Sequence, residues 1–219
     1  MSECAERIRA GLRAVADPER AVGQQAYMKS AMPFLGVRLP DVRRIVAPIV
    51  KPEPSPDALR ALARELWDDA EHREERYAGM AVLAARILRD DLDNIPLIEH
   101  MVATGQWWDI TDDLAHRTAA LHDAHPVTTA EIVTRWSTDP DMWLRRSAII
   151  SQLGRRDRLD SALLAAVIEP NLADREFFIR KAIGWALREY ARVNPAWVRE
   201  YAGTHDLSPL SRREALRHL

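Results

Sequence analysis

The sequence has very little cysteine. Cys4 is the one cysteine among 219 residues, so no disulfide can form within the chain and a cysteine-built metal site is not expected. The residues around Cys4 include Glu3, Glu6 and Arg7, whereas a secretory signal would have an apolar run there. These features together lead us to expect a cytoplasmic protein.

Long apolar runs and several common catalytic motifs are also missing. No stretch of 18 apolar residues occurs, which argues against a membrane partner or a membrane-spanning helix. The sequence has no Gly-rich phosphate loop, no Gly-x-Ser-x-Gly elbow and no His-Glu-x-x-His pair. The seven histidines are scattered, so we expect no metal site.

Net charge is low, but the charges are unevenly distributed. The formal net charge of −2 does not by itself indicate a nucleic-acid partner. Residues 1–140 hold 17 Lys and Arg against 23 Asp and Glu, whereas residues 141–219 hold 14 against 10. A basic surface is therefore predicted in the last third of the chain.

Alternating apolar and polar stretches of the kind that form strands are absent. Nearly every segment between prolines instead has apolar residues at i, i+3, i+4 and i+7, which is typical of amphipathic helices. The clearest linker is the proline-rich run 51–56, but the helical pattern resumes directly after it. We therefore interpret this run as a loop between helices and expect a single domain over residues 1–219.

A repeat of 32 to 36 residues runs through this helical pattern. The positions that recur are Arg76, Asp112, Arg146, Lys181 and Arg213. Two helices per repeat of this length are typical of HEAT-like proteins, so we predict an all-α fold, a curved solenoid of HEAT-like helix pairs. Equivalent positions would line one concave groove, although ordinary solvated helix faces would show the same charges.

Two tryptophans stand beside three carboxylates in the string Gln106–Asp113. Trp108 and Asp112 are four residues apart, so on a helix an indole and a carboxylate share one face. The alternative is that the tryptophans are core residues and the aspartates cap a helix start, which is the usual fate of these residue types.

A second group of candidate residues combines an indole with two cations. Lys181, Trp185 and Arg188 are spaced i, i+4 and i+7, an arrangement that suits nucleic acid. Gly184 stands inside the same helical pattern, where glycine costs about 1 kcal/mol relative to alanine, so it indicates close helix packing. Tyr27 and nearby basic residues form a smaller group that fits either phosphate contacts or plain solvation.

Several dispersed strings form a distinctive set. In chain order they are Tyr27-Met28-Lys29, Phe34-Leu35-Gly36-Val37, Trp107-Trp108-Asp109, Trp143-Leu144-Arg145-Arg146, the segment 176–185 and Leu187-Arg188-Glu189-Tyr190. Together they resemble the AlkD family of bacterial DNA alkylation repair glycosylases. The similarity spans almost the whole chain. Its specificity comes from the order and spacing of the strings more than from any one of them.

The resemblance implies a protein that binds duplex DNA containing alkylated purines. It implies hydrolysis of the N-glycosidic bond of N3- and N7-alkylated purines, including 3-methyladenine and 7-methylguanine, without a metal or an organic cofactor. The residues that it singles out are Asp112 as the catalytic carboxylate, Trp108 and Trp185 as flanking indoles, Arg146 as an arginine close to the lesion, and Tyr27 as a position near the DNA. We expect a monomer.

The physical chemistry of these residues agrees with that function. Alkylation leaves the purine cationic and a good leaving group, so the site chiefly has to stabilise an oxocarbenium-like sugar, which a carboxylate can do. Indole faces would favour the cationic nucleotide, and phosphates would be held by Arg146, Lys181, Arg188 and Arg213. Two alternatives remain: a non-catalytic DNA-binding relative of the same fold, and a HEAT-like protein-interaction scaffold with an apolar or acidic concave surface.

Overall fold

The computed structural model describes residues 2–53 and 55–219, which are all-helical and contain no strand. The α-helices are α1 (Glu3–Ala14), α2 (Pro18–Met28), α3 (Leu39–Val50), α4 (Pro56–Asp68), α5 (Arg73–Val82), α6 (Ile95–Gly105), α7 (Trp108–Ala124), α8 (Pro126–Trp136), α9 (Met142–Ile150), α10 (Ser161–Ile168), α11 (Phe177–Ala191), α12 (Pro195–Thr204) and α13 (Pro209–Ala215). Short 3-10 helices are η1 (Arg86–Leu88), η2 (Leu92–Asn94), η3 (Arg156–Arg158) and η4 (Glu169–Asn171). The predicted all-α class is confirmed.

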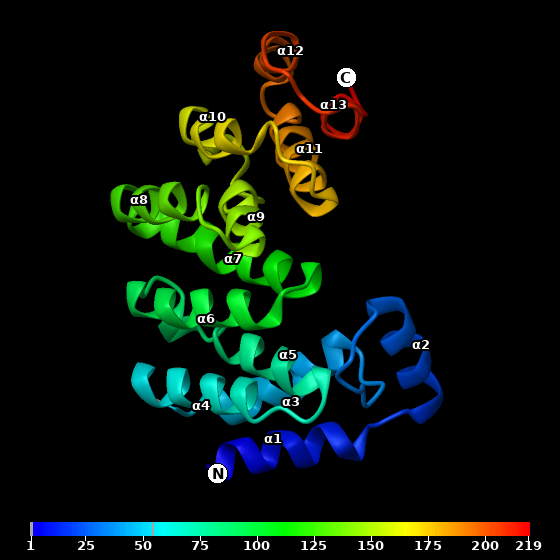
Figure 1. Cartoon of the computed structure of the whole chain (residues 1–219). Coiled ribbons are helices and arrows are strands. Elements are labelled where there is room, and N and C mark those ends of the chain that lie inside the picture. Colours follow the sequence, from blue (N-terminus) through cyan, green and yellow to red (C-terminus); the bar gives the residue numbers. More distant parts are fainter. Residues whose placement is uncertain (1, 54) are drawn as a thin grey trace. The chain divides into compact units, whose positions relative to one another are not determined.

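The helices form two compact units, Met1–Leu97 and Ile98–Leu219. The first contains α1 to α5 and the second contains α7 to α13, so each is described by itself (Figure 1). The single-domain assignment stays a prediction. No helix in residues 2–53 and 55–219 is both long and apolar enough to cross a membrane.

Prolines and small polar caps set the beginnings of many of these helices. Proline occupies the first or second position of α2, α4, α8, α12 and α13, where its missing N–H costs nothing. The side chains of Asp17, Ser55 and Asn194 accept hydrogen bonds from backbone N–H groups of the helices that follow them. The run 51–56 joins α3 to α4, as predicted, although Pro54 itself lies outside the described residues.

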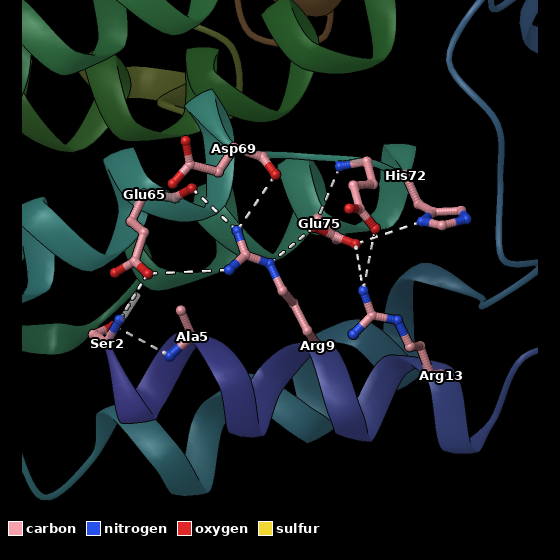
Figure 2. A network of polar contacts seen from close by, with 9 residues as sticks. Ser2, Ala5, Arg9, Arg13, Glu65, Asp69, His72 and Glu75 are labelled. Carbon is pink, nitrogen blue, oxygen red and sulfur yellow. Dashed lines mark hydrogen bonds and ion pairs between the residues drawn. The ribbon is translucent and has the colours of Figure 1, made fainter.

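Arg9 ties α1 to the rest of the first unit (Figure 2). Its side chain is 6% exposed, and Nε donates to Glu75 Oε2 over 3.0 Å. A terminal nitrogen donates to the carbonyl oxygens of Glu65 and Asp69 at 3.4 and 3.5 Å. Because one guanidinium satisfies acceptors on α4, on α5 and in the loop that joins them, it fixes α1 against both helices.

Helix α2 is held by its flanking loop more than by apolar packing. Met28 is its one buried residue among those described. The fully buried carboxylate of Glu74 on α5 accepts hydrogen bonds from the backbone N–H groups of Leu35, Gly36 and Val37 at 2.9 to 3.0 Å. Gly36 has φ +83°, and a Cβ there would lie 2.0 Å from a backbone oxygen, so the loop requires glycine.

The second unit packs its helices largely in chain order. Helix α7 contacts α8 and α9, α9 contacts α11, and α11 contacts α12 and α13. The repeat positions Asp112, Arg146, Lys181 and Arg213 lie on α7, α9, α11 and α13, each on the second helix of a successive pair. Each repeat of 32 to 36 residues in the sequence therefore corresponds to one pair of helices in the structure.

Gly184 allows α11 and α13 to approach each other closely. A Cβ at position 184 would lie 2.5 Å from the Cβ of Glu214 and 2.9 Å from the carbonyl oxygen of Ser211. Both contacts come from α13, so a side chain on α11 at this point would push the two helices apart. The glycine inside the helical pattern is therefore explained by close packing, as expected from the sequence.

Replacing Gly184 with alanine tests this packing. We expect Gly184→Ala to lower the free energy of unfolding by about 1–3 kcal/mol, the usual range for overpacking. Gly203→Ala is the matched control, because a Cβ at that position of α12 would meet nothing within 4 Å. Thermal melts followed by circular dichroism should show a lower melting temperature for the first variant and an unchanged or slightly higher one for the second. Equal melting temperatures would contradict the packing argument.

Candidate functional site

The start of α7 carries the first candidate group. Gln106 has φ +43° and Trp107 is extended, so the chain turns sharply before α7 begins at Trp108. Asp109 follows in the first turn, where the helix dipole favours a carboxylate. Trp108 and Asp112 are one turn apart on this helix, so the indole and the carboxylate share its face.

The carboxylate of Asp112 is held through one of its two oxygens. Oδ1 accepts hydrogen bonds from Arg146 Nη2 at 2.7 Å, Arg146 Nε at 3.1 Å and Thr111 Oγ1 at 3.3 Å. Its hydrogen bonds to the described residues all end on Oδ1, and the side chain is 21% exposed. Oδ2 is therefore the oxygen left to meet a ligand or a water molecule.

Arg146 connects three helices and is itself almost fully enclosed. Its side chain is 5% exposed. Besides Asp112, Nε donates to Thr111 Oγ1 at 3.2 Å and Nη1 donates to the carbonyl oxygen of Phe178 at 2.8 Å. These contacts orient the guanidinium toward α7 and α11. From the sequence we expect Arg146 to bind phosphates; in the structure its donors contact acceptors within the protein, and little of its side chain is exposed.

An aromatic cluster lies beside this ion pair. The rings of Trp107, Trp143 and Phe178 have centroids 5.0 to 6.1 Å apart, and the guanidinium carbon of Arg146 lies 6.0 Å from the Phe178 centroid. Such contacts are worth about 0.5–1.5 kcal/mol each beyond the area they bury. They hold α7, α9 and the start of α11 together around Asp112 and Arg146.

Burial changes the acidity of Asp112. Removal from water raises the pKa of this carboxyl above its ordinary value, against the opposing effect of the Arg146 charge and of the hydrogen bonds from Arg146 and Thr111. The carboxylate of Asp109 adds to the rise. Asp112 therefore takes up a proton at a higher pH than an exposed aspartic acid does.

A second group of charges surrounds Glu214 between α11 and α13. Glu214 Oε1 lies 3.3 Å from Lys181 Nζ and 3.1 Å from Arg217 Nη2, while Oε2 accepts from Arg188 Nη1. Burial alone would raise the pKa of Glu214, but the hydrogen bonds and charges of Arg188, Lys181 and Arg217 outweigh it and hold this pKa below its usual value. The carboxylate is therefore ionised across the neutral range.

The remaining predicted residues lie outside these two groups. Trp185 is on α11 between Lys181 and Arg188, where it is partly buried against the core of the second unit. Arg213 is exposed on α13. Tyr27 is 73% exposed near the end of α2 in the first unit. The structure thus joins Asp112 directly to Arg146, and it joins Lys181 to Arg188 through Glu214.

Four residues of these groups were not singled out from the sequence. Thr111 and Phe178 are contacts of Arg146, Glu214 is the hub of the second group, and Arg217 is one of its partners. Thr111 directly precedes Asp112, and Glu214 is the one acid in an otherwise basic string, so position along the chain gave a weak signal for both. The carbonyl contact of Phe178 carries no sequence signal, because every residue has the same backbone oxygen.

One cluster of possible metal ligands occurs among the described residues. Its members are Glu71, His72 and Glu75, whose ligand atoms lie within 4.8 Å of one another. Arg13 Nη2 lies 3.4 Å from Glu71 and 3.9 Å from Glu75, and Arg9 pairs with Glu75 (Figure 2). Because cations of the protein already neutralise these carboxylates, the cluster is an ion-pair network that joins α1 to α5.

The fold and the site define an all-helical protein with a partly buried carboxylate that is held by an arginine. A sequence model described as "DNA alkylation repair enzyme" matches residues 8–219, so the chain belongs to the DNA alkylation repair enzyme family. A solved structure described as a predicted DNA alkylation repair enzyme from Enterococcus faecalis is similar, with a TM-score of 0.85 and 28% identity over 93% of this chain and 96% of that one. None of the curated proteins compared with the chain matches it.

Because Asp112 is paired with Arg146, removal of the arginine should lower the free energy of unfolding by an amount that depends on pH. We expect Arg146→Met to lower the free energy of unfolding at pH 7 by about 3–5 kcal/mol, because it leaves a buried carboxylate without its counter-charge. Without the arginine the pKa of Asp112 rises further. The penalty therefore shrinks as the pH falls and the carboxyl becomes neutral in both the folded and the unfolded state.

Urea unfolding at pH 7 and near pH 4.5 measures this difference. Arg135→Met is the control, because Arg135 is 62% exposed in its ion pair with Glu99; such pairs are worth about 0–1 kcal/mol. A penalty for Arg146→Met that is equal at both pH values would show that the lost stability comes from packing and not from the charge of Asp112.

Proposed function

We propose that the protein is a DNA glycosylase for cationic N3- and N7-alkylated purines, such as 3-methyladenine and 7-methylguanine, in duplex DNA. It would open base excision repair of these lesions. Membership of the DNA alkylation repair enzyme family supports a role in alkylation repair. The observation that carries the specific activity is the Asp112 carboxylate, which is fixed at Oδ1 by Arg146 and Thr111 and open at Oδ2.

The reaction requires a carboxylate but needs little acid catalysis. Alkylation at N3 or N7 places a positive charge on the purine, so the base leaves as a neutral molecule and takes the electron pair of the glycosidic bond with it. Positive charge develops on the sugar as this bond lengthens, and the negative charge of Asp112 stabilises it. A water molecule then forms the new bond to the anomeric carbon and gives its proton to Oδ2 of Asp112.

In this proposal Arg146 is a positioning residue. Two of its nitrogens hold Oδ1, and a third nitrogen is anchored on the backbone of α11. The carboxylate therefore cannot rotate freely, which favours one orientation of Oδ2 toward the sugar. The short contact also stabilises the ionised form of Asp112, which the reaction requires.

The two indoles would add selectivity for charge. Trp108 shares the α7 face with Asp112, and Trp185 lies on α11 between two cations. An indole face attracts a cation by about 0.5–2 kcal/mol, depending on how far the contact is removed from water. A cationic nucleotide gains this energy and a neutral one does not, so the site would favour alkylated purines over normal bases.

Replacement of Asp112 tests the catalytic assignment. We expect Asp112→Asn to slow release of 7-methylguanine from a duplex carrying one such lesion by about 10²-fold or more, since the amide lacks both the charge and the basic oxygen. Single-turnover release with protein in excess measures this step, and binding of the same duplex should stay within a few-fold of wild type.

Asp113→Asn is the matched control. Asp113 is the next residue of α7 and lies 3.5 Å from Arg117, so its loss removes a neighbouring carboxylate that has a different partner. We expect it to release base at close to the wild-type rate. Duplex binding by wild type without any release would instead identify a non-catalytic DNA-binding relative.

The acidity of Asp112 predicts the pH profile. Release under subsaturating conditions should rise with pH as Asp112 ionises, with its midpoint above the ordinary aspartic acid value of about 3.9 because burial raises this pKa. Rates are corrected for spontaneous depurination at each pH. Arg146→Met should move the midpoint to higher pH. A rate that does not change with pH across the acidic range would contradict a role for ionised Asp112.

A further inference from the structure

Glu214 is a buried anion surrounded by cations that face solvent. Its side chain is 5% exposed, whereas those of Lys181 and Arg217 are 40% and 53% exposed, and that of Arg188 is 18% exposed. The carboxylate therefore lies beneath the surface while two of its three partners reach into solvent. An incoming phosphate would meet Lys181 and Arg217 first.

The position of Glu214 follows from the packing of α13 on α11. Gly184 has no side chain, so the Cβ of Glu214 comes to within 2.5 Å of where a Cβ at position 184 would stand. This close approach places the carboxylate between Lys181 and Arg188, which are on the same face of α11 on either side of Gly184. The charge arrangement is thus part of the helix interface and does not depend on a mobile surface loop.

We propose that Glu214 is a specificity-determining residue that limits the attraction of this surface for the DNA backbone. The inference rests on the proposed function, since it takes duplex DNA as the substrate. Glu214 occupies hydrogen-bond donors of Lys181 and Arg217 that a phosphate would otherwise use, and its charge repels a nearby phosphate. Undamaged duplex, which offers only backbone contacts here, is held less tightly, while recognition of the lesion charge at Asp112 is unaffected.

The neighbouring Arg213 serves as a comparison, because it is a cation that is not paired with Glu214 and can contribute fully to DNA binding. Arg213 is exposed on α13 and forms no ion pair with any residue in the described parts of the chain. Each cation that neutralises a phosphate adds about 0.9 to the slope of the logarithm of affinity against the logarithm of salt concentration. Arg213 should contribute this full amount, whereas Lys181, already paired with Glu214, should contribute less.

The test measures binding of an undamaged 25-base-pair duplex by fluorescence anisotropy over a series of KCl concentrations. We expect Glu214→Gln to bind several-fold more tightly than wild type at moderate salt, with a salt slope steeper by roughly one phosphate equivalent. Glu189→Gln is the matched control. It makes the same change in the net charge of the protein, but Glu189 lies on α11 and pairs with Arg192. Its effect should be much smaller, and Glu214→Asp should stay close to wild type.

A second comparison does not depend on changing a buried residue. Lys181→Met should flatten the salt slope by clearly less than Arg213→Met does. The proposal is overturned if Glu214→Gln binds the duplex with the same affinity as Glu189→Gln or more weakly than wild type. It is also overturned if Lys181→Met reduces the salt slope as much as Arg213→Met does. Failure of the proposed function has a different signature, because wild-type protein would then either bind duplex DNA without releasing 7-methylguanine from a duplex that carries it or not bind duplex DNA at all.

Discussion

The contact between Arg146 and Asp112 is the interaction on which the candidate site depends. A carboxylate on the inner part of α7 is costly to bury without a counter-charge, and the arginine from α9 provides one at 2.7 Å. The same guanidinium reaches the backbone of α11, so one side chain connects α7, α9 and α11. Local stability and the orientation of the proposed catalytic group are therefore set by the same set of hydrogen bonds.

The second unit separates two tasks that both require charge. Around Asp112 a carboxylate is held by an arginine through one oxygen, which suits stabilisation of a positive reaction centre. Around Glu214 several cations share one buried anion, which suits moderate attraction to a polyanion. In the proposed reaction, the burial of Arg146 keeps its guanidinium from facing the cationic nucleotide directly. The buried carboxylate of Glu214 therefore offsets part of the positive charge in the last third of the chain.

Much of the fold could be predicted from the sequence, because helix periodicity and proline positions are local signals. The repeat spacing agrees with the structure in that Asp112, Arg146, Lys181 and Arg213 lie on the second helices of successive pairs. It could not show that Arg146 turns inward, since an arginine at such a position can equally face solvent, and its backbone partner at Phe178 leaves no trace in the sequence. Glu214 was missed for a related reason: its importance comes from the close approach at Gly184, which depends on how two helices pack.

In the proposed function, the fixed carboxylate of Asp112 selects lesions by their positive charge. The most direct measurement compares wild-type release of free base from two otherwise identical duplexes, one with 7-methylguanine and one with the neutral lesion 1,N6-ethenoadenine. We expect release of 7-methylguanine well above its spontaneous rate and little or no release of the neutral base. Equal release of both bases, or release of neither despite duplex binding, would contradict it.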